Sequence, residues 1–517
     1  MTDRSCLRTL RCPDSLAVKN RLKENKDKVL HKSIDWILQE PQYISWEDGD
    51  DVYLLWIKGG AGKGKTMMSI GLIERLSLLR DTSTLVTYFF SQNANYELNT
   101  LEAIIKGLIL QLVNQQKELK ESLRRRWDNV NERFDEDTNS WRTLWDIFLE
   151  MLKYCKCQRV YVIVDALDEC QDDGMADLLK HLVRTGLYYP PKIKWLLTSR
   201  PLDSAERELL AGPDQVLVSL DLNSKHVYKA VKTYIAAKMD ELDRRRNYGE
   251  TLRRKIETEL IEKAEDTYLW VSLVCKRLEN VHRDQALTTI QDLPPGLHPL
   301  YNRVLNQLSE GESAVVKGCV RLLKVMMLAY RPLNIAEVGS VSGLSDEWVT
   351  TEALVGRCAS FVKMQGTTNV EFVHQSARDY LAGKSGQSIL DANECYGHGE
   401  IALSCLSHLS QRLKVNLVDL PRPDSTRESM KRNALVVSVD YAATFWVQHL
   451  DCVKRTTLIE NALSEQGEVG TFLHTKLLEW LECLSLLDKL PHAIEALKTL
   501  TDVPHVSNIG LIFRIIV

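Results

Sequence analysis

The residues best suited to chemistry are the glycines, lysine and threonine of the stretch LLWIKGGAGKGKT, residues 54–66. They fit the pattern G-x-x-x-x-G-K-[ST], in which the main-chain N–H groups of a tight loop point into one concavity at the start of a helix and bind phosphate. Lys65 is predicted to reach the β- and γ-phosphates, and Thr66 to offer its hydroxyl to Mg²⁺. The alternative is a glycine-rich structural turn. The predicted nucleotide-binding residues of the loop are Gly59, Gly60, Ala61, Gly62, Lys63, Gly64, Lys65 and Thr66.

A second group of polar residues follows the continuous apolar run VYVIV, residues 160–164. Such a run is typical of a central parallel strand, and ligands bind at the carboxyl edge of parallel sheets. We therefore predict that Asp165 holds Mg²⁺, directly or through water. Asp168 or Glu169 is predicted to orient and deprotonate an attacking water. The alternative is an acidic loop that caps the next helix.

A third apolar run, IKWLLT at residues 193–198, delivers Arg200 to the same edge. A guanidinium group matches the geometry of phosphate, so Arg200 is predicted to sense the γ-phosphate. The alternative is an arginine that serves only as surface charge.

The elements that must position these residues indicate an α/β nucleotide-binding domain. Five strands are predicted, and the strand TLVTYFF lies between the glycine-rich loop and the acidic residues in the chain. Helices are expected after the loop and at 98–114 and 141–154, on the spacing of their apolar residues. The predicted strands are residues 54–57, 84–90, 160–164, 193–198 and 216–220.

Length and composition bound the remaining possibilities. The chain has 517 residues, which predicts roughly three domains. A net charge of −4 argues against a protein that coats nucleic acid. The basic runs 124–126 and 244–246 lie among acidic residues and are interpreted as solvated helix faces, with a phosphate-contacting patch as the alternative.

The 12 cysteines suggest reduced, mostly buried thiols. Without a secretory signal or a long apolar segment, a cytoplasmic protein with no membrane span is predicted.

The rest of the chain reads as helical, with one exception. The segment LHKSIDWIL, residues 30–38, predicts a helix that either packs beside the nucleotide domain or covers the nucleotide base. Helices followed by two short strands at 359–364 and 370–373 indicate a winged-helix arrangement. The predicted domains are an N-terminal helical lead (1–48), the nucleotide-binding domain (49–222), a small helical domain (223–295), a winged-helix-like domain (296–385) and a C-terminal helical domain (386–517).

Taken together, the motifs resemble one known family. GGAGKGKT, VYVIVDALDEC, KWLLTSRP, PPGLHPLYNRVL, RPLNIAEV and FVHQSARDYL occur in the order seen in fungal NACHT-domain proteins, which are signal-transducing P-loop NTPases of the STAND class and relatives of NLR receptors and heterokaryon-incompatibility proteins. The resemblance covers about residues 6–490 and implies the additional-strand sheet order. This sequence departs from it at Gly60-Ala61, where many relatives have Asp-Pro, and it lacks an evident Gly-x-Pro motif for adenine.

The resemblance implies a signalling switch and oligomerisation scaffold. ATP or GTP would bind with Mg²⁺, ADP or GDP would mark the resting state, and slow hydrolysis would reset the switch. His374 of FVHQSARDYL matches a histidine that touches the diphosphate in related switches, although a lone histidine after a strand is also a common core residue.

The resemblance implies that the partners would be the nucleotide, further copies of the chain and an effector protein in trans. A monomeric turnover NTPase, a small-molecule kinase and a degenerate interaction remnant are the alternatives. The apolar tail GLIFRIIV is interpreted either as the remaining part of a truncated segment or as a docked terminal helix or strand.

Overall fold

The computed structural model describes most of the chain, in ranges separated by gaps. The described residues are 10, 12–25, 35–78, 84–124, 140–171, 173–188, 193–209, 215–220, 224–310, 313–343, 350–366, 368–393, 396–419, 433–453, 462–463 and 467–501. They form two compact units, Met1–Leu300 and Tyr301–Val517. The five domains predicted from the sequence are a finer division than this one, and their boundaries stay predictions.

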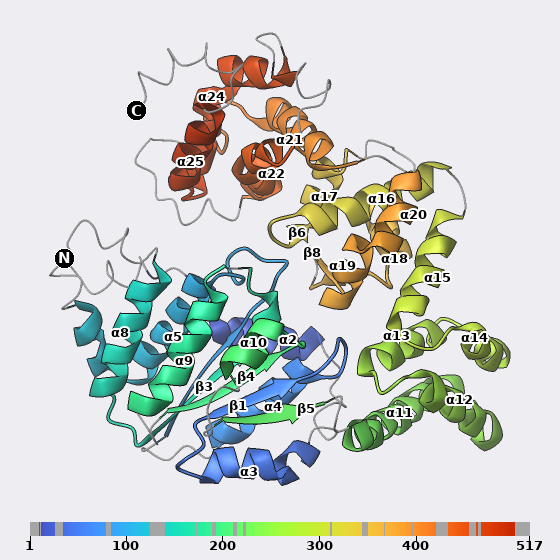
Figure 1. Ribbon diagram of the computed structural model, residues 1–517. Coiled ribbons are helices and arrows are strands. Elements are labelled where there is room, and N and C mark those ends of the chain that lie inside the picture. Colours follow the sequence, from blue (N-terminus) through green and yellow to red (C-terminus); the bar gives the residue numbers. More distant parts are fainter. Residues whose placement is uncertain are drawn as a thin grey trace. The chain divides into compact units, whose positions relative to one another are not determined.

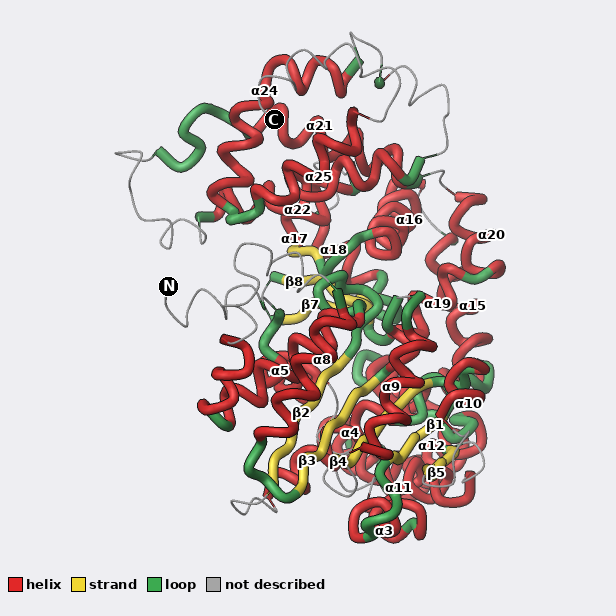
Figure 2. Tube along the Cα trace, turned by 60° about the vertical axis from the view of Figure 1, so that its left-hand side comes forward, coloured by secondary structure: helices red, strands yellow, loops and turns green. Residues whose placement is uncertain are grey.

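A five-stranded parallel sheet forms the centre of the first unit (Figures 1 and 2). Its spatial order is β2-β3-β4-β1-β5, so β4 lies between β1 and β3. This is the additional-strand order, and it confirms the predicted fold class. Strands β1, β2, β3 and β4 are almost wholly buried, as expected when helices cover both faces of a parallel sheet. Their bounds are β1 Leu54–Lys58, β2 Thr84–Phe90, β3 Arg159–Asp165, β4 Ile193–Ser199 and β5 Gln215–Ser219.

Helices pack on the sheet in the manner that their apolar spacing predicts. Helix α4 contacts β2, β3 and β4, and α5 packs on β2 and on α8. Thr100 caps the start of α5, because its hydroxyl accepts from the N–H of Ala103 at 3.2 Å. The helices around the sheet are α2 Ser15–Asn25, α3 Pro41–Asp48, α4 Lys65–Leu78, α5 Leu101–Gln115, α8 Trp141–Tyr154, α9 Met175–Tyr188 and α10 Asp203–Leu209, with short 3₁₀ turns η2 Asp35–Gln39, η3 Lys117–Leu119 and η5 Leu167–Glu169.

The N-terminal lead differs from its prediction. Of the expected helix 30–38, residues 30–34 lie outside the described residues, and the rest forms the 3₁₀ turn η2. Pro41 follows closely, and the residue before a proline is disfavoured in the α conformation, which shortens any helix here. Helix α2 was not predicted, and it packs on β2 and α4. Residues 125–126 of the first basic run and the tail 510–517 also lie outside the described residues.

The first unit ends in a group of helices. Lys263, at the end of α12, donates to the carbonyls of Ile290, Gln291 and Leu293 at 2.7–2.9 Å, which ties α12 to the end of α14. The helices are α11 Ser224–Arg246, α12 Glu250–Lys263, α13 Tyr268–Leu278, η6 Arg283–Gln285 and α14 Ala286–Asp292, followed by α15 Leu297–Ser309, which crosses from the first unit into the second.

The second unit combines a small antiparallel sheet with helices. The sheet has the order β6-β8-β7, and β7 and β8 form the predicted hairpin around Gly366. The described residues after 395 contain helices and no strand, as predicted. Its elements are α16 Ser313–Leu328, β6 Leu333–Asn334, α17 Ile335–Val341, α18 Thr351–Arg357, β7 Val362–Gln365, β8 Asn369–Phe372, α19 Gln375–Ala382, α20 Lys384–Asn393, α21 His398–Arg412, α22 Ala434–Asp451, α24 Glu468–Leu486 and α25 Leu490–Thr501.

An ion-pair cluster joins the RPLNIAEV motif to α22. The carboxylate of Glu337 is buried and accepts from both terminal nitrogens of Arg331, at 2.9 and 2.7 Å. Arg331 also reaches Asp440 at 3.2 Å. A buried carboxylate requires such partners, so this motif is accounted for by the packing of the second unit.

A histidine pair lies inside the same unit. The Nδ1 atoms of His398 and His449 are 2.7 Å apart, and His449 Nε2 is 2.7 Å from the hydroxyl of Tyr441. His449 has no exposed surface, and its burial, followed by the effect of His398, lowers its pKa to about 3. The pair is therefore uncharged at neutral pH.

Two whole-chain predictions can be compared with the described residues. Their cysteines are free thiols, most of them buried. Within the described ranges no helix combines the length and the apolar character needed to cross a bilayer.

Candidate functional site

The glycine-rich loop joins β1 to α4, so that it ends where the helix begins. Gly62 and Gly64 have φ values of +72° and +88°, which residues with a Cβ rarely adopt. Gly59 lies so close to Leu220 that an added Cβ would stand 2.8 Å from its side chain. The glycines therefore give this loop its tight curl, and the first N–H groups of α4 face the ligand side.

Lys65 is the first residue of α4 and turns back over the loop. Its Nζ donates to the carbonyls of Gly59 and Gly60 at 2.6 and 2.9 Å. Burial is the main cause that lowers its pKa, and the charges of Asp168 and Asp165 oppose that shift. The ammonium group thus binds the carbonyls of the loop and is close enough to Asp168 and Asp165 to interact with their charges.

Asp165 ends β3, and its carboxylate is fixed by hydroxyl groups from two other elements. Oδ1 accepts from Ser69 of α4 at 2.7 Å and from Thr198 of β4 at 2.6 Å. All three side chains are buried. Asp165 is therefore held beside the start of α4, where Thr66 also lies. Carboxylate and hydroxyl oxygens are ligands that Mg²⁺ accepts in proteins, usually together with several waters.

The backbone turns sharply directly after Asp165. Ala166 has a φ of +62°, in the left-handed region that costs a residue with a Cβ roughly 1–2 kcal/mol. Its N–H donates to the hydroxyl of Thr198 at 3.0 Å, which helps to hold this conformation. Non-glycine residues in such conformations cluster at functional sites. Here the turn at Ala166 changes the direction of the chain after β3, and Asp168 and Glu169 follow in the short turn η5.

Asp168 contacts Arg200 in two ways. Its Oδ1 accepts from the main-chain N–H of Arg200 at 3.0 Å, and its Oδ2 lies 3.1 Å from Nε of the guanidinium group. The side chains keep 10% and 28% of their surface exposed, so the pair is only partly screened by water. Asp168 is thus engaged in orienting Arg200.

Glu169 has different surroundings. Its Oε2 accepts from the main-chain N–H of Asn93 at 3.2 Å, in the loop after β2. The side chain keeps some exposed surface, but its carboxyl group is densely surrounded. Burial, followed by the charge of Asp168, raises the pKa of Glu169 to about 7. A carboxyl group with a pKa near neutrality is suited to accept a proton.

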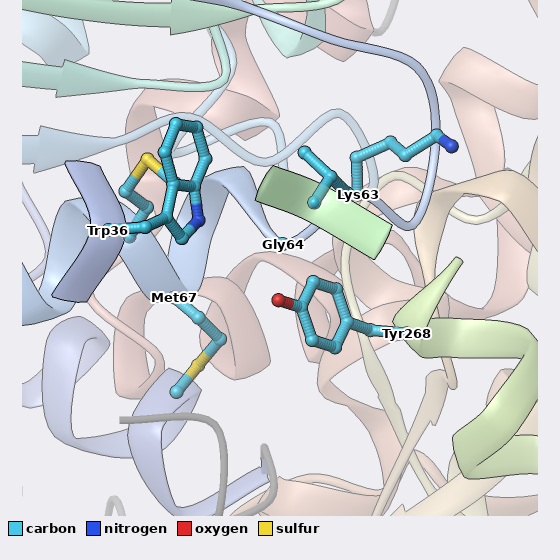
Figure 3. A pocket seen from close by; sticks show the side chains of 7 residues that line it. Trp36, Lys63, Gly64, Met67 and Tyr268 are labelled. Carbon is cyan, nitrogen blue, oxygen red and sulfur yellow. The ribbon is translucent and has the colours of Figure 1, made fainter. Parts of the chain in front are cut away.

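A pocket opens next to the phosphate loop, beside Gly64 (Figure 3). Trp36 of η2 and Tyr268 of α13 come from segments far apart in the chain, and Met67 of α4 also lines the pocket. The hydroxyl of Tyr268 points into the pocket. The seven lining residues are Trp36, Lys63, Gly64, Met67, Met68, Val227 and Tyr268. Two aromatic rings and two methionine side chains therefore lie beside the start of α4.

His374 belongs to the second unit and caps the start of α19. The N–H of Ser376 donates to its Nδ1 at 3.1 Å, which makes Nε2 the protonated nitrogen of the neutral ring. The structure thus assembles the loop, Asp165, Asp168, Glu169 and Arg200 at one sheet edge within the first unit. An approach of His374 to the loop stays a prediction.

Several residues of this site were not predicted from the sequence. Ser69 lies one helical turn after Lys65, and Thr198 lies two residues before Arg200, so both were accessible from spacing along α4 and β4. Asn93 and Tyr268 had no local signal, because they reach the site through the fold, whereas Trp36 lies in the segment 30–38, for which a cover over the base was one of the two interpretations. In the described part of the chain, no group of three or more histidine, cysteine or acidic side chains is arranged to hold a metal ion. A Mg²⁺ site made of Thr66 and Asp165 would therefore need ligands from nucleotide and water.

The sequence is similar to known proteins. A family model described as "Nephrocystin 3, N-terminal" matches residues 32–200. The chain is 33% identical over 520 residues to the vegetative incompatibility protein HET-E-1 of Podospora anserina. That alignment covers 96% of this chain and 38% of the relative, so the chain spans well under half of the relative's length.

The solved structures that match the chain are more distant in sequence. The Orc1 protein of Aeropyrum pernix in complex with DNA is 16% identical, with a TM-score of 0.28, over 69% of this chain and 93% of that chain. Cdc6p of Pyrobaculum aerophilum is 12% identical, with a TM-score of 0.30, over 70% and 93%. A Walker-type ATPase of Pyrococcus abyssi is 14% identical, with a TM-score of 0.31, over 69% and 96%.

Proposed function

The chain belongs to the family of fungal NACHT-type P-loop NTPases, and we propose that it is a nucleotide-controlled switch and oligomerisation scaffold. ATP or GTP would bind with Mg²⁺ to Gly59–Thr66, and ADP or GDP would occupy the resting state. Exchange for triphosphate would release the second unit for self-association, with an effector protein engaged in trans. The cytoplasm is the proposed location. The observation that carries the proposal is Lys65, which lies over a loop of left-handed glycines beside the fixed carboxylate of Asp165.

The loop and pocket support nucleotide binding as one connected site. Phosphates would lie in the concavity of the loop, at the start of α4. The base would then enter the pocket between Trp36 and Tyr268, which opens beside Gly64. This placement favours the interpretation of the lead segment as a cover for the base. The lining does not decide between adenine and guanine.

The residues also fit a Mg²⁺ ion. Thr66 would offer its hydroxyl, and Asp165 would bind the ion directly or through water. Ser69 and Thr198 support this role, because their hydroxyl groups fix one carboxylate oxygen and leave the other side of the carboxylate as a ligand. When bound, the ion would supply charge neutralisation between the β- and γ-phosphates.

We propose a division of labour for the acidic pair in slow hydrolysis. Glu169, with its pKa near 7, would take the proton of the attacking water. Asp168 would hold Arg200 in place through the two contacts described above, so that the guanidinium group meets the γ-phosphate. Asp168 is then a positioning residue.

A switch of this kind needs more than one contact. Moving a two-state equilibrium from 1:99 to 99:1 takes about 5.5 kcal/mol of differential affinity. One hydrogen bond from His374 Nε2 to a phosphate would contribute about 1.5–3 kcal/mol. The rest would come from the recruitment of Arg200 by the γ-phosphate and from a rearranged domain interface.

Mass spectrometry of the nucleotide that co-purifies with the full chain is the direct test. We expect a diphosphate in the wild-type protein, and its loss in Lys65→Ala, because the ammonium group that meets the phosphates is removed. Addition of triphosphate and Mg²⁺ should shift the wild-type protein to larger species in size-exclusion chromatography. A folded wild-type protein that binds no nucleotide with Mg²⁺ would contradict the proposal and favour a degenerate interaction remnant.

A monomeric turnover NTPase is the second candidate, favoured by the presence of a suitable base in Glu169. Steady-state turnover at or above about 1 s⁻¹ without oligomers would support it over the switch. No acceptor-binding motif in the sequence supports a small-molecule kinase.

A further inference from the structure

The turn between α12 and α13, residues 265–268, lies directly on the phosphate loop. A Cβ added to Gly62 would stand 2.8 Å from Cγ2 of Thr267 and 3.0 Å from Cβ of Leu269. A Cβ added to Gly64 would stand 3.2 Å from the ring of Tyr268. The turn therefore contacts both left-handed glycines of the loop. We name residues 265–268 the lid turn.

The lid turn has a defined shape of its own. Glu265 and Asp266 have φ values of +46° and +55°, which place two consecutive residues in the left-handed region. The hydroxyl of Thr267 donates to the carbonyl of Glu265 at 3.0 Å. The Glu265 carboxylate also packs so tightly on Gly296 that an added Cβ would stand 2.5 Å from its Oε2. The carbonyl of Glu265 is thus presented in a fixed direction.

Lys63 binds that carbonyl. Its Nζ donates to the main-chain oxygen of Glu265 at 3.0 Å. In Figure 3 the side chain of Lys63 extends away from the pocket, whereas the Tyr268 hydroxyl points into it. The two lysines of the loop therefore differ. The side chain of Lys65 folds back onto the carbonyls of the loop, whereas that of Lys63 extends away from the loop to the carbonyl of Glu265.

We infer that Lys63 is a positioning residue that holds the lid turn on the phosphate loop and sets how long a nucleotide stays bound. This inference rests on the proposed nucleotide site. Tyr268 and Lys63 both border the pocket beside Gly64, so the lid turn that Lys63 holds lies at the edge of the proposed nucleotide site. The contact joins two protein segments and uses no nucleotide atom. Its loss therefore speeds both entry and release, and it changes the dissociation constant less than either rate.

The test measures nucleotide exchange in the full chain. Fluorescent mant-ADP and mant-GDP are bound with Mg²⁺ and chased with excess unlabelled nucleotide, and association is measured separately. One charged hydrogen bond at an exposed site predicts a release about two- to fivefold faster in Lys63→Ala. Lys63→Arg, which can still donate to the carbonyl, should restore slow release. Lys276→Ala removes an exposed charge from the same group of helices and should release at the wild-type rate.

The outcomes separate this inference from the proposed function. If Lys63→Ala melts at the wild-type temperature and releases nucleotide at the wild-type rate, the role of Lys63 is overturned. The proposed nucleotide site still stands in that case, provided that the wild-type protein binds nucleotide and Lys65→Ala does not. Slower association together with a proportionally higher dissociation constant would assign Lys63 to phosphate binding and also overturn the inference. A wild-type protein that binds neither nucleotide would overturn both.

Discussion

Glu169→Gln is expected to slow hydrolysis about 10²–10⁴-fold without weakening nucleotide binding, which is the usual contribution of a general base. Glutamine has nearly the same shape as glutamate, and its side-chain oxygen can still accept from the N–H of Asn93, as Oε2 of Glu169 does at 3.2 Å. The substitution therefore removes proton uptake and little else. Single-turnover hydrolysis with excess protein measures the chemical step directly.

Asp168→Asn is the matched comparison, because it changes the neighbouring carboxylate in the same way. The main-chain contact to Arg200 at 3.0 Å can be kept by the amide oxygen, whereas the charge opposite Nε is lost. A charge-assisted hydrogen bond contributes about 1.5–3 kcal/mol, and partial exposure places this pair at the lower end. Hydrolysis should then fall only about tenfold, and the affinity for triphosphate should fall with it.

The pH dependence gives a second measure of the same assignment. Glu169 acts as a base only when deprotonated, and its pKa is raised to about 7. The ionised fraction then grows from about 10% at pH 6 to about 90% at pH 8, so kcat/KM, which reports on the free protein, should rise about tenfold over this range. Glu169→Gln should abolish the rise. Equal losses of hydrolysis in the two variants, or a flat wild-type profile, would refute the division of labour.

Two further predictions concern the second unit. His374→Ala should lower diphosphate affinity and raise the oligomeric fraction in size-exclusion runs, and unchanged values of both would remove His374 from the switch. His449 has a pKa lowered to about 3, below the unfolded value of about 6.5, so the unfolded state binds more protons and stability falls as the pH drops below 6.5. This buried ring alone predicts a loss of about 2 kcal/mol at pH 5, measurable by urea unfolding at pH 7 and pH 5. In His449→Gln that difference should shrink, whatever the absolute stability of the variant.

The sequence predicted those parts of the site that depend on local pattern. The apolar runs before Gly59, Asp165 and Arg200 identified three strands, and parallel pairing brings the ends of such strands together. The glycine spacing predicted the loop, because only a few residue types tolerate its backbone conformation. These features are encoded within about ten residues, and the structure has them where they were expected.

Other features depend on contacts between distant segments. The carbonyl of Glu265 meets Lys63 from 202 residues away, and a main-chain acceptor leaves no trace in the residue types. The distinct surroundings of Asp168 and Glu169 likewise come from β4 and from the loop after β2, so adjacent carboxylates could not be told apart by sequence. The segment 30–38 was predicted as one helix because its apolar spacing suits a helix, whereas its described residues, 35–38, lie in the 3₁₀ turn η2, close before Pro41.

The position of β1 in the sheet has a consequence for the order of events during protein synthesis. Leu54 pairs with Trp195 on one side and with Gln215 on the other, so both neighbours of β1 are translated well after it. A nascent chain that ends before β4 presents the strand of the phosphate loop with two unpaired edges, and such edges invite pairing with other chains. Pairings between segments so distant in the chain also form slowly. The emerging polypeptide therefore acquires its capacity to hold a nucleotide late, only after residue 219 has left the ribosome.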